Sequence, residues 1–222
     1  TDAAHISPIR HSDGRITHYL SIQEDITLSK QANERIQWLS HFDALTGLAN
    51  HSLLSDRFDH ATSMAQRSGR TLVLLMLDLD HFKNINDTLG RHIGDALLIE
   101  VARRIQTVVR DEDTVSRQGG DEFVLLMPTT DATGGAHAAE KLLAAMAGNF
   151  LVEAHELTVT PSIGIAVYPA DGATFEALSV SADVVLAWAL AGRVFIAADA
   201  DQNDVVTGQT SFATTTPTFL LN

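Results

Sequence analysis

The chain has 222 residues, 28 of them acidic and 15 basic, which gives a formal net charge of −13, and it has no cysteine. The negative charge argues against non-specific binding to nucleic acid or to an anionic membrane surface. The lack of cysteine excludes disulfides and thiolate metal sites and fits a reducing compartment. No apolar run reaches the roughly 18 residues of a membrane span, so we expect no membrane contact within this segment.

Residues 1–27 show partial alternation of apolar and polar side chains around the turn Ser12-Asp13-Gly14, which predicts a β-hairpin. A two-stranded hairpin is marginal by itself, so we expect its partner strands to lie in a longer chain. With Asp25-Ile26-Thr27 at its end, the segment resembles the C-terminal strands of a PAS sensor domain.

Residues 28–42 have a helical pattern, with Leu28, Ala32, Leu39 and Phe42 near heptad a and d positions. Two interpretations stay open. The segment is either a linker helix that pairs with a copy of itself or a lone amphipathic helix packed on its own domain.

Thr71 to Leu77 is a continuous apolar run, which predicts a strand buried on both faces. It ends abruptly in Asp78-Leu79-Asp80, and carboxylates at the end of a buried strand are typical of functional sites in α/β folds. For Asp78 and Asp80 the alternative is a solvated strand end.

A second stretch of interest is Arg117-Gln118-Gly119-Gly120-Asp121-Glu122-Phe123, which lies between two β-favouring runs. Glycine supplies the positive φ that tight hairpin turns need, so this stretch predicts a hairpin with two carboxylates at its mouth. Taken alone, such a turn is most often an ordinary solvated hairpin.

The remaining elements follow from periodicity: a long helix opening at Gly94-Asp95, a helix over 138–150, a strand over 159–168 and a last helix over 175–190. The order β-α-β-β-α-β predicts an α/β (α+β) domain of ferredoxin-like or palm-like kind, with a sheet that contains antiparallel strands and is flanked by helices. Residues 199–222 are Thr-rich and aperiodic, which predicts an atypical, loosely ordered tail.

Four separated motifs carry a resemblance to the GGDEF family, the diguanylate cyclases, and they set the domain at residues 43–198. They are Asp43-x-Leu-Thr-Gly-Leu-x-Asn50, Asp78-x-Asp-x-Phe-Lys-x-x-Asn-Asp87, Gly90 through Gly94-Asp95-x-Leu-Leu98, and Gly119-Gly-Asp-Glu-Phe123. The resemblance implies an enzyme that joins two GTP molecules into cyclic di-GMP and releases pyrophosphate. It also implies a bacterial cytoplasmic location and a homodimer, because each chain offers one GTP half-site.

The same resemblance implies two Mg²⁺ or Mn²⁺ ions in each active site, because charge builds on a phosphoryl group and on the leaving pyrophosphate. By analogy the ligands are Asp78, Glu122 and the main-chain carbonyl of Leu79. Asp121 is either a shared ligand or the base that helps to deprotonate the 3′-hydroxyl. Asp121 and Glu122 are therefore the expected catalytic residues.

For the substrate, the resemblance assigns Asn86 and Asp95 to the guanine edge, with helix capping as the alternative role of each. The main chain at Phe82, together with Lys83, is assigned to the β- and γ-phosphates. The aromatic rings of Phe82 and Phe123 are expected to be core anchors. Gly119, Gly120 and Arg193 complete the predicted substrate-binding set.

Arg110-Asp111-Glu112-Asp113 has the form Arg-x-x-Asp, and five residues separate it from Gly119. This spacing matches the product-inhibition site of the family, which binds intercalated cyclic di-GMP. The alternative is an Arg and an Asp at the solvated end of a helix.

Three positions depart from the family pattern: His51 and Arg91 replace an expected arginine and histidine, and Leu190 stands where a phosphate-binding lysine is expected. Losing a charge-assisted contact costs about 1.5–3 kcal/mol, roughly ten- to a hundredfold in GTP binding. The departures leave three functions open. They are an active cyclase, a weakened domain that binds GTP or cyclic di-GMP and regulates a neighbour, and a purely structural dimerisation domain.

Overall fold

The computed structural model describes residues 2–12, 14–186, 194–196, 206–207 and 211–213. The chain divides into two compact units, residues 1–40 and 41–222, which we describe separately. No helix in the described part of the chain is both long enough and apolar enough to cross a membrane.

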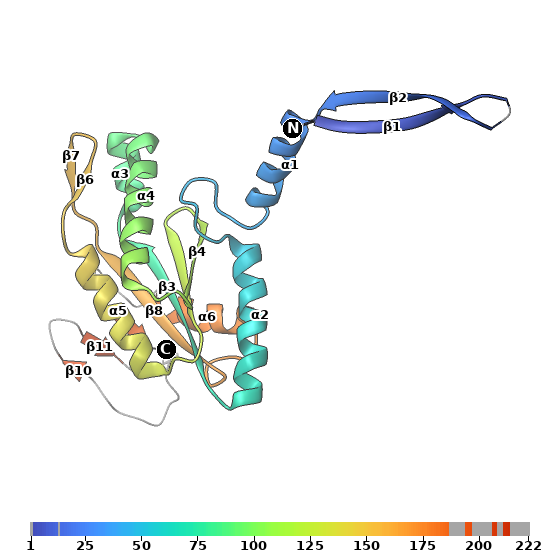
Figure 1. Ribbon diagram of the computed structural model, residues 1–222. Coiled ribbons are helices and arrows are strands. Elements are labelled where there is room, and N and C mark those ends of the chain that lie inside the picture. The colour runs from blue at the N-terminus through green and yellow to red at the C-terminus, as the bar shows by residue number, and fades with distance from the viewer. Residues whose placement is uncertain (1, 13, 187–193, 197–205, 208–210, 214–222) are drawn as a thin grey trace, which may run out of the picture. The chain divides into compact units, whose positions relative to one another are not determined.

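The first unit consists of an antiparallel hairpin and one helix, labelled in Figure 1: β1 (Asp2–Arg10), β2 (Ile16–Asp25) and α1 (Thr27–Leu39). The predicted hairpin and helix are therefore both present. Several large apolar side chains of the hairpin are exposed, among them Ile6, Tyr19 and Ile22, and no residue of α1 is buried. Its assignment to a PAS domain, and the pairing of α1 with a second copy, stay predictions.

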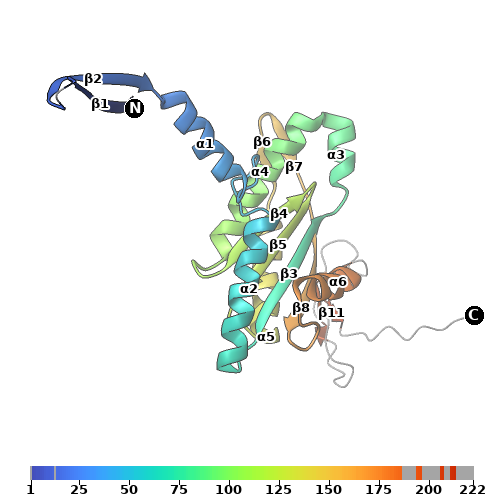
Figure 2. The same cartoon turned by 90° about the vertical axis from the view of Figure 1, so that its right-hand side faces the viewer.

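The second unit is a central sheet with helices on both faces (Figures 1 and 2). Its strands lie in the order β10-β11-β9-β8-β3-β5-β4, and the four strands β8, β3, β5 and β4 are antiparallel neighbours. The strands are β3 (Leu72–Leu79), β4 (Thr114–Gly119), β5 (Glu122–Met127), β8 (Pro161–Tyr168), β9 (Val194–Ile196), β10 (Val206–Thr207) and β11 (Ser211–Ala213), and a separate hairpin pairs β6 (Phe150–Val152) with β7 (His155–Leu157). The helices are α2 (His51–Ser68), α3 (Phe82–Leu89), α4 (Arg91–Val108), α5 (Ala132–Met146) and α6 (Phe175–Leu186). The predicted α/β class is confirmed.

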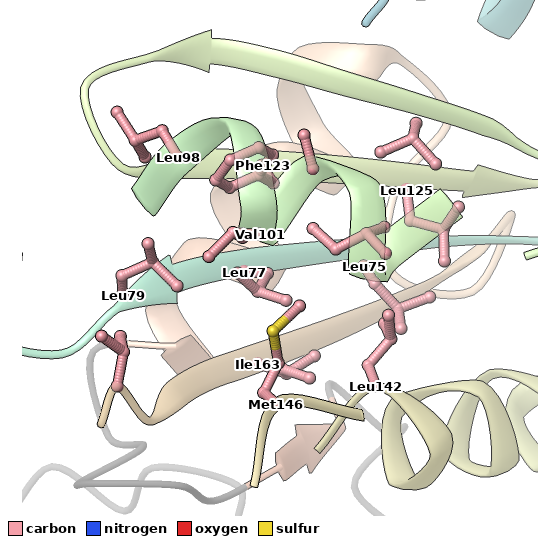
Figure 3. Packing of buried hydrophobic residues seen from close by; sticks show 14 of the residues in the cluster. Leu75, Leu77, Leu79, Leu98, Val101, Phe123, Leu125, Leu142, Met146 and Ile163 are labelled. Atoms are coloured by element: carbon pink, nitrogen blue, oxygen red, sulfur yellow. The ribbon is translucent and has the colours of Figure 1, made fainter. Parts of the chain in front are cut away.

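Strand β3 is buried on both faces because alternate side chains point to two different cores. Leu75, Leu77 and Leu79 join the larger cluster under α4 and α5, which Figure 3 shows around Val101 and Met146. Leu72 and Leu74 face the smaller cluster under α2 and α6. The same alternation gives the face of the sheet on which each of the last residues of β3 lies.

Two predicted helix boundaries were wrong. The helix expected over 138–150 begins at Ala132, where the Asp131 side chain accepts a hydrogen bond from Gly134 N, and it ends at Met146. The helix expected to open at Gly94 begins at Arg91, immediately after Gly90, whose φ is 91°. Asp95 therefore lies inside the first turns of α4 and does not cap it.

The predicted last helix is described as far as Leu186. Of the tail, only the short strands β10 and β11 are described, so its loose order stays a prediction.

Candidate active site

The Gly119-Gly120 turn joins β4 to β5 as predicted. Its glycines have φ values of 140° and 53°, which side chains of other residues rarely adopt. The strand register skips Gln118, since Arg117 pairs with Phe123 and Gly119 pairs with Glu122. The turn therefore leaves Asp121 directly before β5 and Glu122 at its first position.

The carboxylates of the hairpin meet the end of β3. Leu77 lies opposite Phe123 and both side chains belong to the larger cluster, so the next residues, Asp78 and Glu122, share the other face of the sheet. Burial raises the pKa of Asp78 to about 6, and the negative charges of Asp121 and Glu122 add to this effect. A hydrogen bond from the Leu79 amide acts in the opposite direction and lowers the pKa. Three acidic groups thus lie within electrostatic reach of one another.

This donor set fits a divalent cation that keeps other ligands. In the described residues no group of three or more His, Asp or Glu side chains is arranged to hold a metal ion by itself. Mg²⁺ usually takes one or two carboxylates and completes its shell with water and substrate phosphates. Hard carboxylate oxygens held close together are suitable ligands for such an ion.

Asp80 directly follows β3. Its partners include one residue of β8 and the residue just before β8. Its carboxylate accepts hydrogen bonds from Thr160 Oγ1 at 2.6 Å and from Ser162 Oγ at 2.7 Å. Asp80 is therefore bound to protein groups, and a purely solvated strand end does not describe it.

The predicted guanine contacts meet where α3 and α4 lie side by side, beyond the end of β3 (Figure 2). The Asn86 side chain lies directly over Gly94, where a Cβ would overlap the amide oxygen. Asp95 is the next residue and is exposed. The Phe82 ring is 6% exposed and the Phe123 ring 2%, so both are core anchors as expected, whereas Lys83 is exposed at the start of α3.

An ion pair that the sequence did not predict supports the turn. Arg117 NH1 lies 3.1 Å from each carboxylate oxygen of Asp43, and Arg117 Nε and NH2 donate to the Gly120 carbonyl at 3.0 and 2.7 Å. The side chains of Arg117 and Asp43 are 11% and 19% exposed. Burial would raise the pKa of Asp43, but hydrogen bonds from Thr46 and the Arg117 guanidinium hold it below its usual value.

The segment that contains Asp43 also pairs with β4. Ala49 N donates to the Val115 carbonyl at 3.2 Å, and Arg117 N donates to the Ala49 carbonyl at 3.0 Å. The first motif of the sequence therefore lies against β4, the outer strand of the hairpin that contains Gly119 and Gly120.

The Arg-x-x-Asp motif forms a tight turn after α4. Asp113 is only 8% exposed and its carboxylate accepts a hydrogen bond from Arg110 N at 2.9 Å, whereas the Arg110 guanidinium is exposed and lies 3.5 Å from Glu112 Oε1. Burial raises the pKa of Asp113 despite the bond and the charge of Arg110. A cavity of about 310 Å³ adjoins the motif and is also lined by Leu48 and Arg57.

Two of the three residues that depart from the family pattern are among the residues that the structure describes. His51 Nδ1 and Gln118 Oε1 are 2.7 Å apart, so the imidazole donates to the residue that bulges before the turn. Arg91 is exposed in the first turn of α4. Leu190 and the predicted phosphate ligand Arg193 lie outside the described residues.

The domain is a mixed α/β fold in which an antiparallel hairpin presents acidic residues beside the end of a buried strand. The chain belongs to the GGDEF family: the family described as "Diguanylate cyclase, GGDEF domain" matches residues 40–192.

Among curated relatives, the bifunctional diguanylate cyclase/cyclic di-GMP phosphodiesterase MucR of Pseudomonas aeruginosa is 44% identical over 156 residues, which are 70% of this chain and 23% of MucR. The structure of the GGDEF domain of TpbB (YfiN) from the same organism is 33% identical with a TM-score of 0.69, covering 72% of this chain and 96% of that one. The coiled coil and GGDEF domain of DgcB from Caulobacter crescentus, in complex with c-di-GMP, is 27% identical with a TM-score of 0.68, covering 78% and 93%. This chain spans about a quarter of the length of MucR.

Proposed function

We propose that this domain is a diguanylate cyclase that condenses two GTP molecules into cyclic di-GMP. The 3′-hydroxyl of each GTP attacks the α-phosphorus of the other, so two P–O bonds form, two break and two pyrophosphates leave. The observation that carries the proposal is the meeting of Asp78, Asp121 and Glu122 at the end of β3. Carboxylates that repel one another in the apo protein favour the binding of a divalent cation.

In this proposal Asp78, Glu122 and the Leu79 carbonyl hold Mg²⁺ or Mn²⁺, two ions in each site. When bound, the cations would neutralise charge on the transferring phosphoryl group and on the leaving pyrophosphate. Asp121 either shares a metal ion or takes the proton of the attacking 3′-hydroxyl.

The substrate contacts follow from the placement of α3 and α4. Asn86 and Asp95 are suited to the guanine edge, since the amide can donate to O6 and the carboxylate can accept from N1–H and N2–H. Lys83 and the main-chain N–H groups at the start of α3 are suited to the β- and γ-phosphates. Gly119 and Gly120 let the nucleotide approach the main chain, and Arg193 adds a further phosphate contact.

Catalysis then requires two copies of the chain with their GTP half-sites facing each other. The two nucleotides react with each other symmetrically, so a two-fold arrangement is the simplest assembly. In this view the preceding hairpin and α1 belong to the part of the protein that controls how the two domains meet. Arg110 and Asp113 form the site at which product halts turnover.

A second function is favoured by one observation, the leucine at position 190 where the family pattern has lysine. A domain that lacks this phosphate contact would bind GTP or cyclic di-GMP and regulate a neighbouring domain without turnover.

The deciding experiment is incubation of the purified protein with GTP and Mg²⁺, followed by chromatography of the nucleotides. We expect cyclic di-GMP from the wild type and none from Asp121→Ala or Glu122→Ala, while Glu140→Ala, an exposed acidic residue of α5, behaves as wild type. Bound GTP without product would support the regulatory module. Product from both hairpin variants would contradict the assigned catalytic site.

A further inference from the structure

Asp80 makes three contacts that tie the end of β3 to the start of β8. Its carboxylate oxygens accept one hydroxyl each, from Thr160 and Ser162, and its backbone N–H donates to the Thr160 carbonyl at 2.9 Å. Hydroxyl bonds to a carboxylate are short and strong because the acceptor is charged. We refer to Asp80, Thr160 and Ser162 as the strand-end clasp.

The backbone bond between Asp80 and Thr160 shows where the Leu79 carbonyl points. In an antiparallel ladder, successive residues direct their N–H and C=O groups alternately to the two neighbouring strands. The Asp80 N–H points to the β8 side, where it meets the Thr160 carbonyl. The Leu79 carbonyl therefore points to the β5 side, toward the hairpin that carries Asp121 and Glu122, where the last paired residues are Leu77 and Phe123.

Without such a restraint, the strand end would tend to move away from the hairpin. Asp78 lies among the like charges of Asp121 and Glu122, and like charges at short range oppose the close geometry that a cation needs. The ladder on the β5 side ends at Leu77, so it does not hold Asp78 in place. On the β8 side, Asp78 pairs with Ser162, the residue whose hydroxyl also binds Asp80.

We propose that Asp80 is a positioning residue for the cation site: the clasp holds the Asp78 carboxylate and the Leu79 carbonyl toward the hairpin before any cation arrives. The inference rests on the proposed function for its catalytic meaning. Because each Asp80 oxygen already accepts a hydroxyl, from Thr160 or Ser162, the proposal gives Asp80 an orienting role and leaves the metal contacts to the neighbouring residues. Groups of this kind, which orient ligands without touching the ion, typically affect metal affinity or activity about 10- to 100-fold.

The test is the double variant Thr160→Val/Ser162→Ala, which removes both hydroxyls and leaves every expected metal ligand unchanged. We expect the Mg²⁺ concentration for half-maximal activity to rise roughly tenfold, while kcat at saturating Mg²⁺ and the KM for Mg²⁺-saturated GTP stay within about twofold of wild type. Asp80→Asn should give a smaller rise, because an amide can still bond one hydroxyl as acceptor and the other as donor. The control is Thr158→Val, whose hydroxyl bonds to Asn149 instead.

A second readout does not depend on turnover. The increase in melting temperature caused by Mg²⁺ in the presence of GTP should be half-complete at a roughly tenfold higher Mg²⁺ concentration in the double variant. If the wild type makes no cyclic di-GMP, the proposed function fails, but this thermal midpoint still decides the role of the clasp.

Equal Mg²⁺ midpoints for wild type and double variant would overturn the proposal. So would a loss of kcat that high Mg²⁺ does not restore, or a wild type whose melting temperature does not respond to Mg²⁺ and GTP. If the double variant melts far below the wild type before any Mg²⁺ is added, the Mg²⁺ midpoint is measured on Asp80→Asn instead. An unchanged Mg²⁺ midpoint in Asp80→Asn would then count against the proposal.

Discussion

Replacing Asp78 with asparagine should stabilise the apo protein at neutral pH. The pKa of Asp78 is raised from its usual 3.8 to about 6. Between these values the folded state holds a proton that the unfolded state has lost, so stability falls as the pH rises from about 4 to about 6, and the full penalty is present above that range. An asparagine side chain at this position would be uncharged in both states and would remove the penalty.

The gap between the two pKa values sets an upper bound of about 3 kcal/mol, at about 1.4 kcal/mol for each pH unit. Solvent around Asp121 and Glu122 screens their charges, and the asparagine weakens the hydrogen bond from the Leu79 amide, so we expect a net gain of about 1–2 kcal/mol. For a chain of this length that corresponds to a melting temperature about 3–6 °C higher.

The assay is thermal unfolding in EDTA at pH 7.5 and at pH 4, with Asp87→Asn, an exposed acidic residue of α3, as control. The gain should be present at pH 7.5, small at pH 4, and reduced by Mg²⁺ and GTP, which should stabilise the wild type more because it keeps the Asp78 carboxylate. An Asp78→Asn protein that melts at or below the wild-type temperature at pH 7.5 in EDTA would refute the inferred repulsion.

Three further predictions concern other parts of the domain. Arg117→Ala should lower the free energy of unfolding by about 2–3 kcal/mol in urea, because it removes the guanidinium that pairs with Asp43 and bonds the Gly120 carbonyl; a change below about 0.5 kcal/mol would contradict this. Gly94→Ala should raise the KM for GTP roughly tenfold with little change in kcat, because the new Cβ displaces the Asn86 amide; an unchanged KM would exclude that position for guanine. Arg110→Ala should raise the final level of cyclic di-GMP in a long incubation, and an equal plateau would rule out inhibition at this motif.

The central elements were predictable because their signals are local. A continuous apolar run that stops at Asp78 is typical of a buried strand with a polar end, and Gly119-Gly120 between two β-favouring runs favours a tight turn. The family resemblance assigned Asn86 and Asp95 to the same guanine edge, and in the structure the Asn86 side chain lies against Gly94, the residue before Asp95.

What the sequence did not predict depends on contacts between distant residues. Gly134 and Gly135 disfavour a helix locally, yet α5 runs through both of them. A Cβ at Gly135 would lie 2.8 Å from the Val73 side chain, so glycine at this position allows α5 to pack closely on β3. The Arg117–Asp43 pair joins residues 74 positions apart, and the hydroxyl partners of Asp80 lie about 80 positions away. No local pattern carries such information.

The pairing of Ala49 with β4 has a consequence for self-association. β4 is the last strand of its sheet, and an uncovered outer strand is a template on which a foreign strand can add. Here the Val115 carbonyl and the Arg117 N–H, which would bond such a strand, are already taken by Ala49. The covered edge therefore guards this side of the domain against sheet-to-sheet aggregation.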